Sequence, residues 1–64
     1  MLPADLIRSD NKLSFAELAR REGVSSAAVY RWHRSDPPLP AVKHGRRFVT
    51  SVEALDWWMG ERAR

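Results

Sequence analysis

A single glycine, Gly23, separates two short segments that each begin with the signals of a helix start. In the first segment, Ser14 and Glu17 have the spacing of a capping box, in which each side chain accepts a hydrogen bond from the other residue's backbone amide. In the second segment, Ser25 is a residue type preferred at a helix N-cap. Gly23 itself can adopt the left-handed conformation that ends a helix and turns the chain sharply. The pattern predicts two helices joined by a tight turn over residues 14–34.

Apolar residues recur along both predicted helices at the spacing of one buried face. The inward positions are occupied by Phe15, Leu18, Ala19, Val24, Ala28, Val29 and Trp32. Ala19 has the small side chain needed where two helices cross closely, because a larger one would push them apart. Together with the tight turn at Gly23, this spacing is the one that a helix-turn-helix needs. An ordinary helical hairpin with solvated charges has the same spacing and is the structural alternative.

Three prolines after the second helix exclude its continuation and predict an extended link. Residues 41–49 are rich in β-branched and aromatic side chains around a turn that contains a glycine, which predicts a β-hairpin. Its register has two alternatives. A two-residue loop would pair Val42 with Arg47, and a three-residue loop would pair Val42 with Phe48. The second is favoured because it buries more apolar surface.

Thr50 and Glu53 repeat the capping-box spacing and predict a closing helix over residues 51–62. The inward face of this helix would carry Val52, Leu55, Met59 and, at its edge, Trp58. Trp57 points nearly the opposite way on the helical wheel. It either packs on the N-terminal segment, residues 1–12, or faces a second copy of the chain. The first is favoured because the apolar residues of that segment otherwise lack a partner. These residues are Leu2, Leu6 and Ile7.

The composition is that of a small domain that folds around an apolar core. The 64 residues suffice for one domain, and 44% of them are hydrophobic, including three tryptophans with large apolar area. Because the chain has no cysteine, it has neither a disulfide nor a cysteine zinc site. No apolar run approaches the roughly 20 residues that span a bilayer, and the N-terminus lacks the features of a signal peptide. We expect one mainly α-helical domain over residues 1–64, with a small β-hairpin, in the cytoplasm.

Positive charge is concentrated in the middle of the chain. Residues 25–50 contain a single acidic residue, Asp36, and five basic residues. The basic residues are Arg31, Arg34, Lys43, Arg46 and Arg47. Basic and acidic residues cancel over residues 1–24, and acidic residues are in slight excess over residues 51–64. A concentrated basic face is typical of a surface that binds phosphate groups.

The predicted second helix presents an outward face suited to the edges of base pairs. Arginine can bind guanine through two hydrogen bonds, Ser and Tyr hydroxyls reach base edges or phosphates, and an alanine methyl can contact thymine. The amides at the helix N-terminus favour a phosphate, and a basic hairpin can follow the DNA backbone or enter a narrow minor groove. These features predict binding to double-stranded DNA. The expected contact residues are Ser25, Ser26, Ala27, Tyr30, Arg31, Arg34, Lys43, His44, Arg46 and Arg47.

The stretch from Leu13 to Met59 resembles the excisionase-type, AlpA-like helix-turn-helix domain of the MerR-like winged-helix superfamily. The matching features follow the same order: a glycine turn, the "VYRW" helix, a proline-rich link, the "GRRFVTSVEAL" hairpin and a closing helix. The chain is also similar to short bacterial proteins in which "YRW" is followed by "GRR", "TS" and "EAL". The resemblance implies a winged helix-turn-helix that acts as a phage or mobile-element excisionase-like factor, or as a small transcriptional regulator, at the bacterial nucleoid. The long link over residues 36–40 departs from the family pattern.

No motif in the chain indicates catalysis or a bound cofactor, so we expect a binding protein rather than an enzyme. His33 and His44 are the only histidines and no cysteine accompanies them, so we expect no metal site. His33 is expected on the helix surface or against a phosphate. The alternative function is a protein-interaction module, in which Tyr30, Trp57 and the arginines would be interface hot spots. The local charge argues against it, because the cores of protein interfaces are depleted in charged residues.

Overall fold

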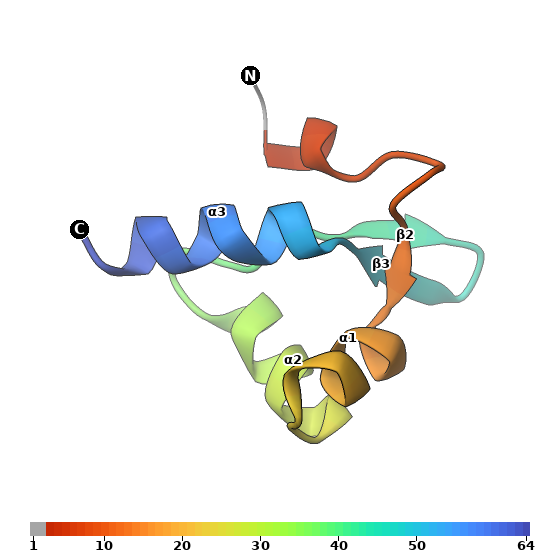
Figure 1. Cartoon of the computed structure of the whole chain (residues 1–64), viewed down its shortest axis with the longest axis horizontal. Coiled ribbons are helices and arrows are strands. Elements are labelled where there is room, and N and C mark those ends of the chain that lie inside the picture. Colours follow the sequence, from red (N-terminus) through yellow and green to blue (C-terminus); the bar gives the residue numbers. More distant parts are fainter. Residues whose placement is uncertain (1–2) are drawn as a thin grey trace.

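The computed structural model describes residues 3–64, which form short helices and strands (Figure 1). In chain order they are the 3-10 turn η1 (Pro3–Leu6), strand β1 (Leu13–Ser14), helices α1 (Phe15–Glu22) and α2 (Ser26–Arg34), strands β2 (Val42–His44) and β3 (Arg47–Thr50), and helix α3 (Val52–Arg62). The result is a small α/β domain with three α-helices and a three-stranded antiparallel sheet in the described residues. The predicted helices and hairpin are present, and the third strand was not predicted.

Local hydrogen bonds define the α1–α2 pair as the sequence predicts. The Ser14 Oγ accepts from the Glu17 amide at 3.1 Å, and the Glu17 Oε1 accepts from the Ser14 amide at 2.9 Å. Gly23 ends α1 in the left-handed conformation, with a φ of 71°. The Ser25 Oγ accepts from the Ala28 amide at 3.3 Å and caps α2. The predicted capping box, the turn and the extent of both helices are therefore confirmed.

The β2–β3 hairpin has a register that the sequence did not predict. Val42 pairs with Val49, and the two-residue loop is Gly45–Arg46. Both predicted partners of Val42, Arg47 and Phe48, are therefore wrong. The loop needs a positive φ at its first residue, and only glycine adopts such a φ without strain. The φ of 65° at Gly45 meets this need and makes Gly45 the first residue of the loop.

Strand β1 adds a third strand to the hairpin. It pairs with β3 in the antiparallel sense, with Leu13 opposite Thr50 and Ser14 opposite Val49, so the strand order is β1-β3-β2. A strand of two residues shows no alternating pattern, and the sequence therefore carries no signal for it. Its consequence is that α1 begins directly from the sheet, which sets the position of α1 relative to the hairpin.

The start of α3 lies one residue later than predicted. Thr50 remains in β3 and is fully buried, and its Oγ1 donates to the Pro40 carbonyl at 2.8 Å. The N-cap is Ser51, whose Oγ accepts from an amide in the first turn of α3 at 3.0 Å and donates to the Leu6 carbonyl at 2.8 Å. The predicted capping box of Thr50 with Glu53 is therefore wrong, because the pairing of β3 with β1 keeps Thr50 extended.

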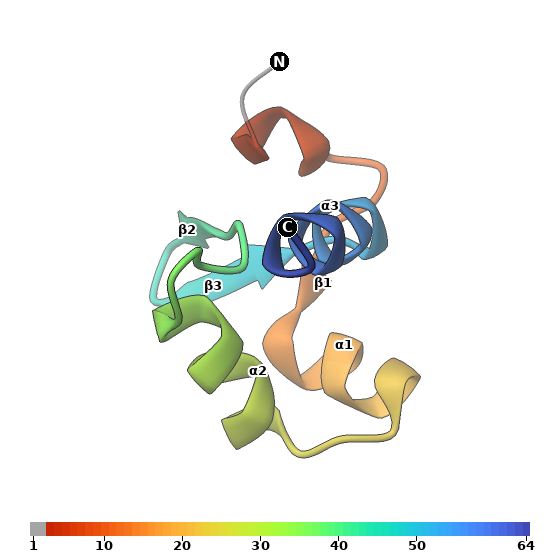
Figure 2. The ribbon, with the colours of Figure 1, turned by 90° about the vertical axis from the view of Figure 1, so that its left-hand side faces the viewer.

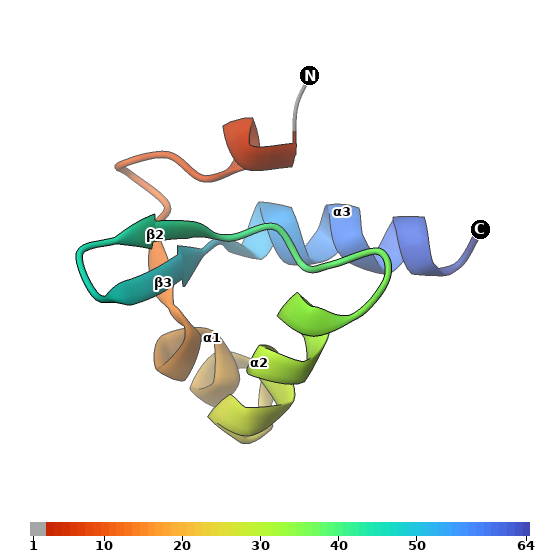
Figure 3. The same ribbon diagram turned by 180° about the vertical axis from the view of Figure 1, so that it is seen from behind.

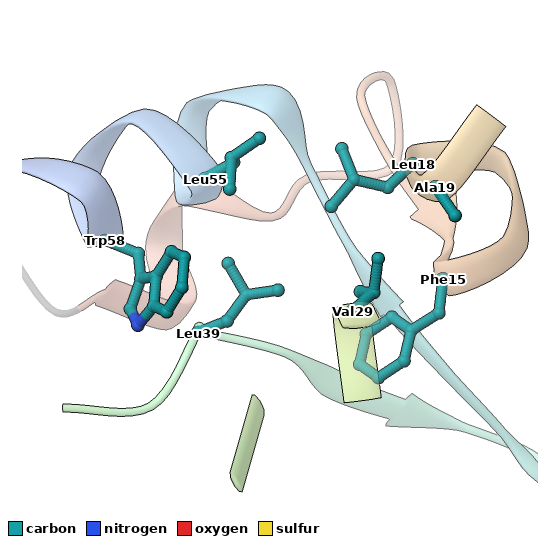
Figure 4. Close-up of a cluster of buried hydrophobic side chains, with 7 residues drawn as sticks. All are labelled: Phe15, Leu18, Ala19, Val29, Leu39, Leu55 and Trp58. Carbon is teal, nitrogen blue, oxygen red and sulfur yellow. The ribbon is translucent and has the colours of Figure 1, made fainter. Parts of the chain in front are cut away.

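The core gathers side chains from all three helices and from the link between α2 and β2 (Figure 4). It contains Phe15, Leu18, Ala19, Val29, Leu39, Leu55 and Trp58. Leu39 lies between prolines of the link and was not predicted as a core residue, yet it is fully buried. Its amide donates to the Trp32 carbonyl at 2.9 Å, which folds the link back over the end of α2. Val24, predicted to face inward, is 37% exposed because it lies in the turn, where helical periodicity no longer applies.

The buried face of α3 is rotated from the predicted one. Ala54, Leu55 and Trp58 are at most 2% exposed, whereas Met59 is 47% exposed. The Trp58 Nε1 donates to the Pro37 carbonyl at 2.8 Å, so the link both covers this tryptophan and satisfies its polar atom. The prediction for Leu55 is confirmed, and the inward position of Met59 is wrong. The link decides the rotation, because it packs on the side of α3 that carries Trp58.

Turn η1 lies on the side of α3 that faces away from α1 and α2 (Figure 2). Trp57 points towards this side, is half-buried and packs against the core. It lines an apolar hollow of about 250 Å³ together with Pro3, Ala4 and Pro40. The favoured packing of Trp57 on Leu6 or Ile7 stays a prediction, because neither residue lines this hollow. Leu2, one of its predicted partners, lies outside the described residues.

Candidate nucleic-acid interface

Helix α2 presents its polar and basic face to the surface. Every expected contact residue of α2 and its cap is exposed, namely Ser25, Ser26, Ala27, Tyr30, Arg31 and Arg34. The opposite face is anchored by Val29, which is fully buried, and by Trp32, which packs against the core. The helix lies at the edge of the molecule, below the β2–β3 hairpin (Figure 3). The outward face of α2 is therefore held in a fixed orientation by the core beneath it.

Tyr30 is both anchored and accessible. Its ring packs edge-on against Phe15, with 4.8 Å between the ring centroids and 76° between the ring planes, while the residue remains 41% exposed. A ring held in this way has lost much of its rotational freedom before any ligand binds, so contacting a ligand costs less entropy. Tyr30 is thus a rigid aromatic side chain within a basic surface.

The β2–β3 hairpin carries the second group of expected contact residues. Its exposed polar residues are Lys43, His44, Arg46 and Arg47. Phe48 fixes the hairpin to the helices, because its ring stacks on Phe15 with centroids 5.7 Å apart and lies 4.9 Å from the His33 ring. The Lys43 Nζ lies 5.8 Å from the centroid of the Phe48 ring. The hairpin cations therefore stand on a sheet that is packed against α1 and α2.

A hollow of about 370 Å³ joins α2 to the hairpin. Ser26 and Tyr30 line it from α2, Arg47 lines it from β3, and the rings of Phe15 and Phe48 contribute apolar surface. Two groups of residues that are separate in the sequence thus border the same depression. This hollow makes the outward face of α2 and the base of the hairpin one continuous surface.

The cations of this surface are available to a ligand. Ion pairs within residues 3–64 join Arg8 to Asp10, Arg8 to Glu53 and Arg64 to Glu61. None of the five basic residues of α2 and the hairpin takes part in one of these pairs. No carboxylate of residues 3–64 forms an ion pair with them, so their charge can attract an anionic partner.

His33 has a structural contact that the sequence did not indicate. It is half-buried, and its Nδ1 lies 2.9 Å from the Leu39 carbonyl oxygen. Because a carbonyl only accepts hydrogen bonds, Nδ1 must carry the proton, and the bond ties α2 to the link. His44 is exposed on the hairpin. No cluster of three or more His, Cys, Asp or Glu side chains suited to a metal occurs in residues 3–64.

Arg62 is a basic residue of this region that was not among the expected contacts. It is exposed in the last turn of α3, and its guanidinium lies 4.6 Å from the centroid of the Trp58 ring. It borders a second hollow, of about 380 Å³, together with Arg31 of α2. The sequence offered no signal for this proximity, because Arg62 belongs to a segment in which acidic residues are in excess.

Within residues 3–64, no helix combines the length and the apolar character needed to cross a membrane. Comparison of the chain with models of known protein families, with curated proteins and with solved structures finds no match.

Proposed function

We propose that this chain binds double-stranded DNA as a winged helix-turn-helix domain. In this proposal α1 and α2 form the helix-turn-helix, α2 enters the major groove, and the β2–β3 hairpin is the wing that contacts the backbone or a minor groove. The observation that carries the proposal is the hollow bordered by Tyr30 and Arg47, which joins α2 to the hairpin. These two elements carry five cations that form no ion pair within residues 3–64.

The chemistry of this surface suits duplex DNA. A major groove accommodates one α-helix, and the exposed Arg31 and Arg34 offer the paired donors that recognise guanine. Lys43, Arg46 and Arg47 carry positive charge on the hairpin, where it suits contacts with backbone phosphates that do not depend on base sequence. The sequence resemblance favours a small transcriptional regulator or an excisionase-like factor of a bacterium or phage.

The protein-interaction alternative has less support. It relies on both Tyr30 and Trp57 as exposed anchors of an interface. Tyr30 is exposed, but Trp57 is half-buried and packs against the core. One of the two anchors is therefore occupied within the chain itself.

Salt dependence tests the proposed function. Each cation that neutralises a phosphate releases a counterion, so four or five contacts predict a slope of about −4 for log affinity against log salt concentration. Fluorescence anisotropy with a labelled random-sequence duplex measures this slope across a salt series. A slope near zero, or no binding at low salt, would contradict DNA binding. An interface with a protein, anchored by aromatic residues, should change far less with salt.

A further inference from the structure

The second hollow lies on the side of α2 that is turned away from the hairpin. It is bordered by Arg31 and Trp32 of α2, by Asp36 of the link, and by Trp58 and Arg62 of α3. Two exposed arginines from different helices therefore face one depression with a volume of about 380 Å³.

Arg62 stands on a rigid aromatic support. Its guanidinium lies 4.6 Å from the centroid of the Trp58 ring. Trp58 is 1% exposed, its Nε1 is bonded to the Pro37 carbonyl, and its ring lies 5.4 Å from that of Trp32. A guanidinium stacked on a ring keeps its N–H donors free at the edge of the plane, where they can bind a phosphate through two hydrogen bonds.

We propose that Arg62 binds a DNA backbone phosphate at this hollow, beside Arg31 of α2, as an additional contact of the interface. The inference rests on the proposed function and extends it. The DNA-binding surface then runs from the hairpin, across α2, to the C-terminal end of α3. Its ligand at this end is a phosphodiester group, and the contact is independent of base sequence.

The shape of the molecule agrees with an interface of this extent. The hairpin and the C-terminal end of α3 lie at opposite ends of the longest axis, and α2 protrudes between them (Figure 1). This axis measures 31 Å, which corresponds to about nine base pairs of B-DNA at about 3.4 Å each. A helix in the major groove is then flanked on both sides by cations that can reach the backbone.

Asp36 provides an internal check because it borders the same hollow. A phosphate bound by Arg62 at this hollow is repelled by the negative charge of Asp36, so the acidic residue weakens the contact. Neutralising Asp36 should therefore strengthen DNA binding. A purely structural role of Arg62, as a cover for Trp58 or a positive charge at the end of α3, predicts no such effect.

The test compares salt slopes of four variants by fluorescence anisotropy with a random-sequence duplex. Arg62→Gln should lower the magnitude of the slope by about one, and its affinity deficit should shrink about 3.5-fold between about 50 and 200 mM salt. Arg62→Lys keeps the charge and should retain the slope. Asp36→Asn should raise the affinity. Arg64→Gln is the control and should leave the slope unchanged, because Arg64 is paired with Glu61 at 3.3 Å.

The outcomes separate this inference from the proposed function. If the unmodified protein binds with a steep slope and Arg62→Gln retains that slope, the additional contact is overturned and DNA binding stands. A lower melting temperature of Arg62→Gln with an unchanged slope also overturns it, because the role of Arg62 is then structural. Equal losses in Arg62→Gln and Arg64→Gln overturn the hollow as the site. Absence of DNA binding by the unmodified protein overturns both proposals.

Discussion

The arginines of α2 and those of the hairpin have different neighbours, and we expect them to contact different parts of the DNA. Arg31 projects from α2, whose orientation is set by the buried Val29. Arg46 lies in the hairpin loop, and Arg47 stands beside the hollow that leads to α2. A side chain on a helix in the major groove can read base edges, whereas cations on a hairpin contact mainly phosphates. The same residue type is therefore expected to have two distinct effects on DNA binding.

We expect substitution to separate base recognition by Arg31 from phosphate binding by the hairpin arginines. Arg31→Ala should cost about 1–3 kcal/mol on a preferred site and relax base preference there. The double variant Arg46→Ala with Arg47→Ala should weaken binding to all sequences alike and reduce the salt slope. Selection of binding sites from random DNA, followed by anisotropy, measures both quantities. A change of base preference in the double variant, with an unchanged preference in Arg31→Ala, would reverse the assignment.

Gly23 and Gly60 offer the same substitution in two backbone conformations. Gly23 has a φ of 71°, whereas Gly60 lies inside α3, and an added Cβ meets no atom within 4 Å at either position. Gly23→Ala should lower the free energy of unfolding by about 1 kcal/mol, because the left-handed conformation strains a residue with a Cβ. Gly60→Ala should raise it by up to about 1 kcal/mol, because alanine favours the helix. Chemical denaturation measures both, and shifts of the same sign would be inconsistent with the left-handed turn.

At the scale of one element, α1 shows how a cap links stability to pH. The backbone amide of Ser14 donates to the Glu17 carboxylate and lowers the pKa of Glu17 below its ordinary value, with further contributions from the Ser14 side chain and from Arg20. A lowered pKa in the folded state stabilises the fold at neutral pH. This stabilisation is lost as the pH falls through the lowered pKa, because the carboxyl group then becomes protonated.

Glu17→Gln should isolate this effect. Glutamine can accept the same hydrogen bond from the Ser14 amide, but it does not titrate. The melting temperature of the unmodified protein should exceed that of Glu17→Gln at about pH 7, and the two should converge as the pH falls through the lowered pKa of Glu17. Thermal melts followed by circular dichroism across this range provide the measurement. Curves that remain parallel would show that the charge of Glu17 does not stabilise α1.

At the scale of the whole molecule, long-range hydrogen bonds hold the elements around a small core. The Ser51 Oγ donates to the Leu6 carbonyl across 45 positions of the chain and ties the N-terminal segment to α3. Trp58 donates to the Pro37 carbonyl of the link in the same way. Trp57 packs against the core and borders a hollow that Pro3 and Pro40 also line.

Trp57→Ala tests whether this packing or self-association explains the residue. Truncation of a buried aromatic costs about 3–5 kcal/mol, so we expect about 2 kcal/mol for the half-buried Trp57. Met59→Ala is the matched control on the same helix and should change stability little, because Met59 is 47% exposed. Melting temperature and cooperativity on long duplexes are the measurements. Unchanged stability with lost cooperativity would instead assign Trp57 to a contact between copies.

The sequence by itself determined those features that depend on neighbours three or four positions away. The capping box of Ser14 with Glu17, the left-handed turn at Gly23 and the cap at Ser25 are all local, and each is present as predicted. The six expected contact residues of α2 and its cap are exposed, as the helical pattern predicts. The four of the hairpin are also exposed, although both predicted registers are wrong. Their role in binding DNA stays a prediction.

Only the tertiary structure decided the features that join distant parts of the chain. The burial of Leu39, the rotation of α3 and the displaced cap at Ser51 depend on contacts between segments. The same holds for the hollows that bring Tyr30 beside Arg47 and Arg31 beside Arg62. Local patterns leave such choices open, because two helix faces of similar hydrophobicity differ little in energy until a third segment packs on one of them.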